Sequence, residues 1–74
     1  MMLSDLQLNE CAKIIKMPKD KNFALRLYDM GISEGCKVKC LLKPLLKSPI
    51  LFLIKDTLIA IRLSDCRKIE VEYE

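Results

Sequence analysis

The stretch that decides the fold spans residues 23–38 and reads Phe-Ala-Leu-Arg-Leu-Tyr-Asp-Met-Gly-Ile-Ser-Glu-Gly-Cys-Lys-Val. It contains both glycines of the chain, Gly31 and Gly35. The first half has apolar residues at helical spacing, and Gly31 follows where a helix end commonly needs a left-handed residue. The second half is typical of a tight turn that leads into a strand. The stretch therefore predicts a short helix, a stop and the start of a strand.

The predicted helix covers residues 23–30. At 100° per residue, Phe23, Leu27 and Met30 form one apolar stripe, which we expect to face the core. Arg26 and Asp29 fall on the opposite, polar side, where they can form a local pair.

Upstream of the helix, residues 11–17 read as the first strand. Ala12 and Ile14 share one face of it, and the proline that follows ends it because proline cannot donate to a strand ladder. Either Asp20 or Asn22 can cap the helix that comes next.

Downstream of the helix, the pattern changes to strands. Alternating or continuous apolar runs occur at residues 36–42, 50–54, 57–63 and 68–73. In the first run, Leu42 shares the expected inner face with Cys40. Residues 55–56 suit a two-residue hairpin turn, and residues 64–66 suit a brief helical turn capped by Ser64. Five short strands with one helix inserted after the first predict a mainly β fold, a small barrel whose closure removes exposed sheet edges.

The N-terminal segment is expected to cover one mouth of the barrel. Leu3, Leu6 and Leu8 supply the apolar surface, and Ser4 is a plausible N-cap for a one-turn lead-in. Asn9 fits the turn before the first strand because asparagine tolerates the left-handed conformation.

Length and composition narrow the class of protein. The chain has 74 residues, which predicts one domain over residues 1–74, and it is 51% hydrophobic and 31% charged, unlike a disordered chain. The formal net charge of +3 is weaker than the clustered excess of nucleic-acid-binding domains, so solvated lysines are the favoured interpretation.

The first residues do not resemble a signal peptide, and no apolar run approaches the ~20 residues of a spanning helix. We expect a cytoplasmic protein with reduced thiols.

Catalysis and nucleic-acid binding both lack their usual residues. The chain has no histidine, no nucleophile elbow and no phosphate-binding loop, which argues against an enzyme. Its four aromatic residues are scattered, whereas a barrel that binds nucleic acid stacks bases on aromatics of one exposed face.

The four cysteines are the only candidates for a soft metal site: Cys11, Cys36, Cys40 and Cys66. Cys36 and Cys40 share a strand face but are separated by roughly 13 Å at the rise of an extended strand, too far for one tetrahedral ion. Cysteine is also among the most buried residue types, so small apolar core residues are the favoured interpretation. We predict no metal site and no cofactor.

In its order and spacing, the chain resembles the FeoA family, small cytosolic proteins associated with bacterial ferrous iron uptake. Residues 25–38 are similar to the family signature Arg-Leu-x-x-Leu-Gly-φ-x-x-Gly-x-x-Val, in which φ is apolar. Residues 3–6 with 12–14 match its opening, and residues 58–62 and 69–71 match its last strands. Asn9 and Asp56 stand where the family commonly has glycine, and the segment Leu-Lys-Ser before Pro49 replaces a common Gly-Asp pair.

The resemblance implies an SH3-like barrel with an inserted helix and a non-enzymatic role as accessory or regulator of the ferrous iron transporter FeoB. The cytosolic GTPase domain of FeoB is the implied partner, and the protein would meet the membrane only through that transporter. The family is often associated with transition-metal binding. A related barrel forms the C-terminal domain of metal-dependent transcriptional repressors, which implies an alternative role as a regulatory domain.

A loop between two prolines, residues 43–49, is the predicted partner-binding surface. It carries two adjacent leucines between two lysines: Lys43, Leu45, Leu46 and Lys47. Exposed apolar groups with charged neighbours are typical of an interaction site, although one leucine could instead plug the barrel mouth. Arg26 on the polar side of the helix completes the predicted surface.

Overall fold

The computed structural model describes residues 1–44 and 48–74. A 3-10 turn, η1 (Leu3–Asp5), precedes β1 (Cys11–Lys16) and α1 (Lys21–Asp29). The strands β2 (Lys37–Leu42), β3 (Ile50–Ile54) and β4 (Thr57–Ile61) follow, then the short helix α2 (Leu63–Cys66) and β5 (Glu70–Tyr73). Five strands with one longer helix after the first confirm the predicted mainly β fold.

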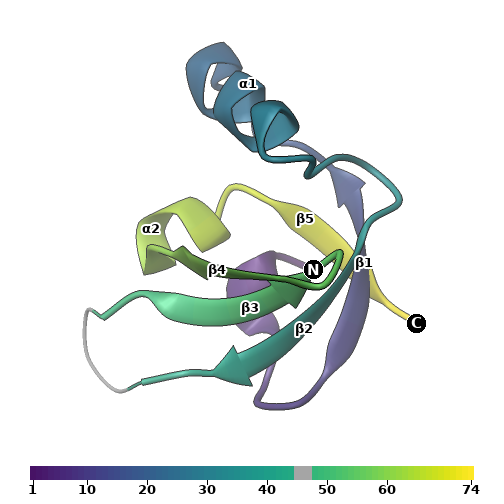
Figure 1. Ribbon diagram of the computed structural model, residues 1–74, viewed down its shortest axis with the longest axis vertical. Helices are drawn as coiled ribbons and strands as arrows, with labels where there is room; N and C mark the ends of the chain where they lie inside the picture. Colours follow the sequence, from purple (N-terminus) through teal and green to yellow (C-terminus); the bar gives the residue numbers. More distant parts are fainter. Residues whose placement is uncertain (45–47) are drawn as a thin grey trace.

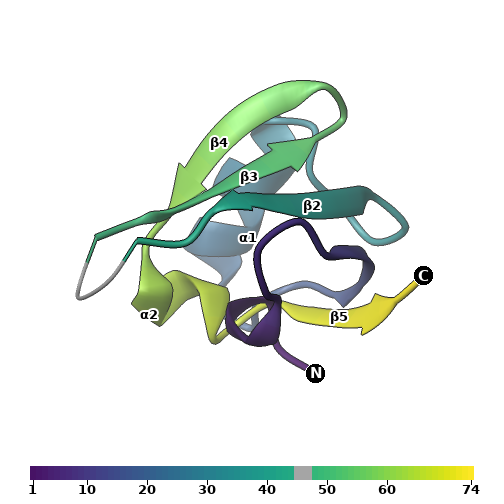
Figure 2. The ribbon, with the colours of Figure 1, turned by 90° about the horizontal axis from the view of Figure 1, so that it is seen from below.

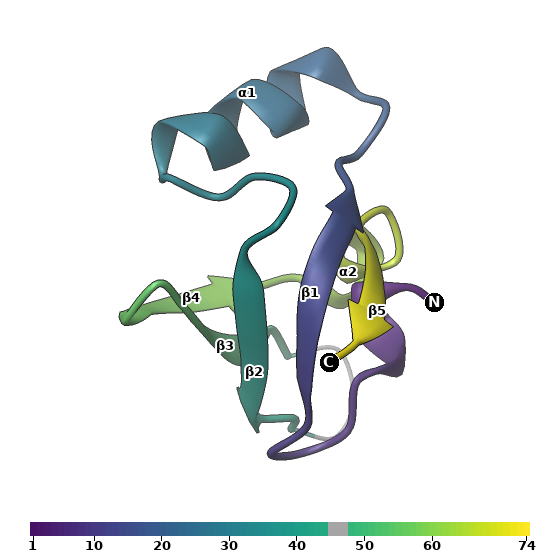
Figure 3. The same cartoon turned by 90° about the vertical axis from the view of Figure 1, so that its right-hand side faces the viewer.

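The strands form one antiparallel sheet in the order β4-β3-β2-β1-β5. The sheet curls around a core of apolar side chains that all five strands supply (Figure 1). The helix α1 lies beyond one end of the curled sheet, and η1 and α2 lie near its other open side (Figures 1 and 3). None of the helices in the described residues is long and apolar enough to cross a lipid bilayer.

The helix α1 begins where the capping rules place it. The side chain of Asp20 accepts hydrogen bonds from the backbone N–H groups of Asn22, at 3.0 Å, and Phe23, so Asp20 and not Asn22 is the cap. Phe23 and Leu27 are buried as predicted, but Met30 is 53% exposed, which contradicts the predicted stripe. Met30 lies one residue beyond the helix, at its C-cap, so it does not continue the face that packs on the core.

The turn after α1 needs both glycines. Gly31 has φ of 85° and Gly35 has φ of 90°, values that side chains with a Cβ adopt only at a cost. The Cys36 thiol holds this turn together, because its sulfur accepts from the Ser33 N–H at 3.4 Å and lies 3.7 Å from the Gly31 carbonyl oxygen. The hydroxyl of Tyr28 donates to Glu34 at 3.0 Å, which raises the Tyr28 pKa and joins the helix to the turn.

The other predicted turns are confirmed in part. Asn9 and Asp56 have positive φ, as does Lys55, so the two-residue hairpin between β3 and β4 forms. Ser64 is not the cap of the second helix; α2 starts at Leu63 with Arg62 at its N-cap, because β4 already ends at Ile61.

Three further predictions are wrong, two on side-chain burial and one on a helix cap. Leu42 is 56% exposed because the register between β2 and β3 shifts after Cys40, which turns its side chain outward. Leu8 is 55% exposed, whereas Leu3 and Leu6 do cover the core. The N-cap of η1 is Met2 and not Ser4, because η1 already begins at Leu3; the backbone N–H of Met2 donates to the Asp5 carboxylate at 2.9 Å.

Candidate protein-docking surfaces

Lys43, the first residue of the predicted docking surface, is half-buried directly after β2. Its ammonium group donates to the carbonyl oxygens of Ser4, at 3.0 Å, and Leu6, at 2.9 Å. These bonds join the end of β2 to the N-terminal segment, so the charge of Lys43 serves the fold. Its part in docking stays a prediction.

The remaining residues of the predicted surface do not gather around Lys43. Leu45, Leu46 and Lys47 lie outside the described residues. Arg26 is exposed on α1, and its guanidinium carbon lies 5.6 Å from the centre of the Phe23 ring. The end of β2 and the helix α1 lie at opposite ends of the molecule (Figures 1 and 3). The structure therefore separates Arg26 from the loop that begins at Lys43.

The structure instead places Arg26 beside β4. A groove of about 260 Å³ separates α1 from this strand, with Phe23, Arg26 and Met30 among the residues of its helical wall. Arg62 lines the opposite wall and was not among the predicted site residues. The only sequence signal for this groove is weak: Leu58 and Ala60 are apolar at positions where an alternating strand faces solvent.

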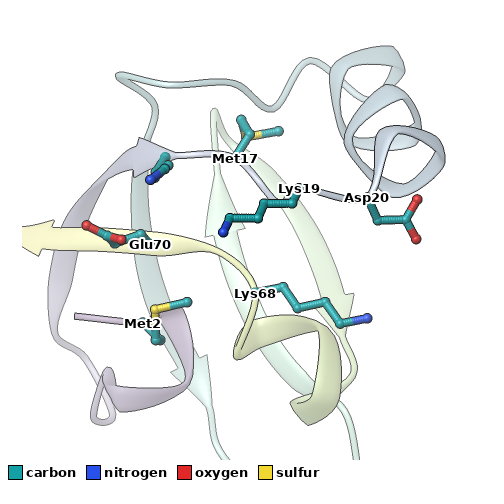
Figure 4. Close-up of a pocket in the computed structure, with 7 residues that line it drawn as sticks. Met2, Met17, Lys19, Asp20, Lys68 and Glu70 are labelled. Carbon is teal, nitrogen blue, oxygen red and sulfur yellow. The ribbon is translucent and has the colours of Figure 1, made fainter.

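A second groove of about 470 Å³ lies between the end of β1 and the start of β5 (Figure 4). It has methionine, lysine and carboxylate side chains in its lining: Met2, Lys16, Met17, Lys19, Asp20, Lys68 and Glu70. Lys19 points into the groove, whereas Lys68 points away from it (Figure 4). The carboxylate of Asp20 caps α1, and the mixed charges favour neither an anion nor a cation.

The cysteines do not form a metal site in the described part of the chain. Cys36, Cys40 and Cys66 are buried and Cys11 is exposed, and all four are free thiols. No group of three or more histidine, cysteine or acidic side chains that could hold an ion occurs among the described residues. The donor set therefore does not fit a resident transition metal.

We expect the protein to bind neither Fe²⁺ nor Zn²⁺ stoichiometrically at micromolar affinity. Isothermal titration under anaerobic, reducing conditions measures this directly. A one-to-one site in that titration would contradict the prediction.

Burial sets the chemistry of Cys66. It raises the pKa of the thiol to about 12, and the neighbouring Asp65 carboxylate and Cys40 thiol add to the effect. Burial also raises the pKa of Cys40. Both thiols are thus protonated at neutral pH and act as small core residues, since the thiolate is the form that binds metals.

Because the pKa of Cys66 is raised in the folded protein, the free energy of unfolding should fall as the pH becomes alkaline. In the unfolded chain the thiol ionises near its usual value of 9.0, whereas in the folded protein it stays protonated up to about pH 12. The contribution of Cys66 to the free energy of unfolding is therefore complete below the unfolded-state pKa of 9.0. It is lost as the pH rises toward the folded-state pKa of about 12. Within this window, each pH unit costs about 1.4 kcal/mol.

We expect Cys66→Ala to weaken this pH dependence while lowering stability at neutral pH. Urea unfolding at several pH values from about 8 to about 10.5 gives the slope for each variant. Cys11→Ala, which removes the exposed thiol, is the matched control and should keep the wild-type slope. Equal slopes for Cys66→Ala and the wild type would mean that the loss of stability at alkaline pH does not come from Cys66.

The five-stranded antiparallel sheet with a helix inserted after its first strand defines a small β-barrel domain. The sequence model of the FeoA domain matches residues 1–73. The chain therefore belongs to the FeoA family, as its signature residues predict.

Solved structures agree with this assignment. The solution structure of FeoA from Chlorobium tepidum is 27% identical, with a TM-score of 0.90 over 99% of this chain and 70% of that chain. FeoA from Stenotrophomonas maltophilia, crystallised with zinc and described as an SH3-domain protein, is 28% identical, with a TM-score of 0.79 over 97% of this chain and 89% of that chain. These relatives confirm the predicted SH3-like fold.

The same fold occurs inside larger regulators. A manganese-dependent transcriptional repressor has a TM-score of 0.90 at 13% identity, and the match covers 100% of this chain and 41% of that chain. This likeness shows the fold alone. No curated protein matches the chain in sequence.

Proposed function

We propose that this protein is a non-enzymatic accessory or regulatory protein of bacterial ferrous iron uptake that binds the cytosolic GTPase domain of a FeoB-type transporter. The family match over residues 1–73 carries the proposal. The Stenotrophomonas maltophilia relative, described as a candidate ferrous iron transport activating factor, supports the same role. In this proposal residues 1–74 act as one domain in the cytoplasm, without a cofactor.

The chemistry of the chain supports a binding role over a catalytic one. The sequence has no histidine, and all of its buried side chains in the described residues are apolar or thiol. In the part of the chain that the structure describes, no charged or hydroxyl side chain is therefore held in a buried setting where it could act as a general acid or base.

The proposed contact surface combines Arg26 with Lys43, Leu45, Leu46 and Lys47. Lys43 would act by holding the start of its loop against the N-terminal segment, through its bonds to Ser4 and Leu6. The leucines would supply the apolar anchors, which commonly contribute most of the binding energy of an interface.

We expect the double substitution Leu45→Ser and Leu46→Ser to weaken binding to the transporter domain about tenfold or more, because it removes both anchors. Pulldown and titration with the purified GTPase domain measure the loss, and the melting temperature should not fall. Leu8→Ser, at an exposed leucine outside this loop, is the matched control. Unchanged affinity in the double variant would exclude the loop as the contact surface.

The alternative role, a regulatory domain of the metal-dependent repressor type, rests on the fold alone. A repressor also needs a DNA-binding unit, and the described residues contain only the short helices η1, α1 and α2 beside the sheet. Binding of the transporter domain would favour the accessory role over this alternative.

A further inference from the structure

The strand β4 is an open edge of the sheet. Among the described residues it pairs only with β3, and Ile54 lies opposite Thr57 on either side of the two-residue turn at residues 55–56. In such a hairpin, the residues that flank the turn form a hydrogen-bonded pair, and pairing then alternates along the strands. The backbone N–H and C=O groups of Leu58 and Ala60 therefore point away from β3. No other described residue bonds to them.

The groove beside α1 runs along this edge. Four consecutive residues, 59–62, line it. Successive side chains of a strand point to opposite faces, so four in a row can line one groove only where it follows the edge of the strand. Phe23, Leu27 and Met30 give the facing wall an apolar surface, and α1 lies behind the β3–β4 hairpin in Figure 2.

Positive charge gathers around this groove. The chain has only three arginines against ten lysines, and two of the three lie here. Arg26 and Arg62 line the groove, and Arg62 and Arg67 line a neighbouring depression of about 400 Å³. The salt bridges of the described residues involve lysines, not these arginines. The one acidic residue in the groove, Asp65, lies 4.0 Å from the Lys68 ammonium group.

We infer that the groove binds an extended, acidic segment of a protein partner, which adds to β4 as a further strand. The backbone of the segment bonds to the outward groups of Leu58 and Ala60, as in other cases of strand addition. Its carboxylates meet Arg26 and Arg62, whose planar guanidinium groups suit bidentate pairing. The inference rests on the proposed function only for the identity of the protein that carries the segment.

Charge and hydrogen bonding distinguish this occupant from two others. A second copy paired through β4 would offer residues 57–61, which carry no carboxylate to pair with Arg26 or Arg62. An anionic membrane surface could pair its charges with the arginines and bury Leu58, which is 63% exposed. It has no backbone N–H or C=O groups, however, to bond to the free edge of β4.

The direct test titrates the isotope-labelled protein with a capped nine-residue peptide of alternating glutamate and valine. We expect a Kd below about 1 mM, with shifts of the backbone amides of Leu58 and Ala60 and slower hydrogen exchange at both. A peptide of alternating lysine and valine should not bind. Absence of binding, equal binding of both peptides, or shifts confined to other strands would overturn the inference.

Two sets of variants separate the charge from the backbone edge. Arg26→Glu with Arg62→Glu should weaken the acidic peptide about tenfold or more, whereas Lys19→Glu with Lys21→Glu, which changes the net charge equally, should weaken it much less. Ala60→Pro removes one outward N–H that the fold does not use, and should abolish binding. If Ala60→Pro does not fold, the arginine variants and the amide shifts still decide the matter. Equal weakening by both charge reversals would overturn the inference.

Further measurements separate this inference from the proposed function. If the peptide binds and the transporter domain does not, the proposed partner is wrong and the groove assignment stands. If the transporter domain binds equally well to the wild type and the double arginine variant, the groove assignment is overturned for that partner. Dimerisation abolished by Ala60→Pro, or flotation with phosphatidylglycerol vesicles without peptide binding, would also overturn it.

Discussion

Replacing Phe52 by alanine is expected to lower the free energy of unfolding by about 3–5 kcal/mol, the cost of deleting a large aromatic side chain from a core. Phe52 lies in β3 with 0% exposure and is the largest fully buried side chain among the described residues. A chain of 74 residues has a total stability of roughly 4–11 kcal/mol. Phe52→Ala should therefore remove a large part of the stability, and we expect a substantial fraction of the protein to unfold.

Urea unfolding followed by circular dichroism measures this effect, through the shift in midpoint at unchanged slope. Leu58→Ala on the neighbouring strand is the matched control, because its side chain is 63% exposed and should cost less than about 1 kcal/mol. If Phe52→Ala were as mild as the control, the core would not be packed as described.

Replacing Lys43 by methionine is expected to lower the free energy of unfolding by about 1.5–3 kcal/mol, the range for hydrogen bonds to charged groups. Methionine keeps the apolar stem but cannot donate to the carbonyl oxygens of Ser4 and Leu6. The N-terminal segment, whose Leu3 and Leu6 cover the core, would lose a fixed contact to β2.

Thermal and urea unfolding measure the loss, and faster amide hydrogen exchange in residues 3–6 would locate it. Lys21→Met is the matched control, since Lys21 is exposed at the start of α1 and should change stability by less than about 0.5 kcal/mol. A Lys43→Met variant as stable as this control would mean that Lys43 is free for docking, as the sequence alone suggested.

The candidate site was less predictable than the fold. Arg26 was predicted from its place on the polar side of the helix, but its neighbours were not. Arg62 and Ala60 come close to α1 only because the β3–β4 hairpin folds back beside the helix. A pattern along the chain indicates which side of a strand faces solvent, yet it does not say which other element borders that side.

The environment of Lys43 was also not predictable from the sequence, because a residue expected at the surface forms internal hydrogen bonds. In the sequence it is a charged residue next to a proline, and exposure is the ordinary expectation for lysine. In the structure its ammonium group binds carbonyl oxygens of residues 39 and 37 positions earlier in the chain. Contacts of this kind depend on how the sheet closes, which no local pattern encodes.

The sequence by itself determined the turns and, through them, the order of the elements. Gly31 and Gly35 in residues 23–38, with Asn9 and Asp56 elsewhere, stand where the backbone has positive φ, a requirement that is local and restricts the residue types allowed. The tertiary structure alone decided that Met30 and Leu42 are exposed, that Lys43 is bonded internally, and that Arg26 and Arg62 line a groove beside an open strand edge. Those outcomes depend on helix ends, a register shift and contacts between distant segments, whose energies are set only when the strands pair.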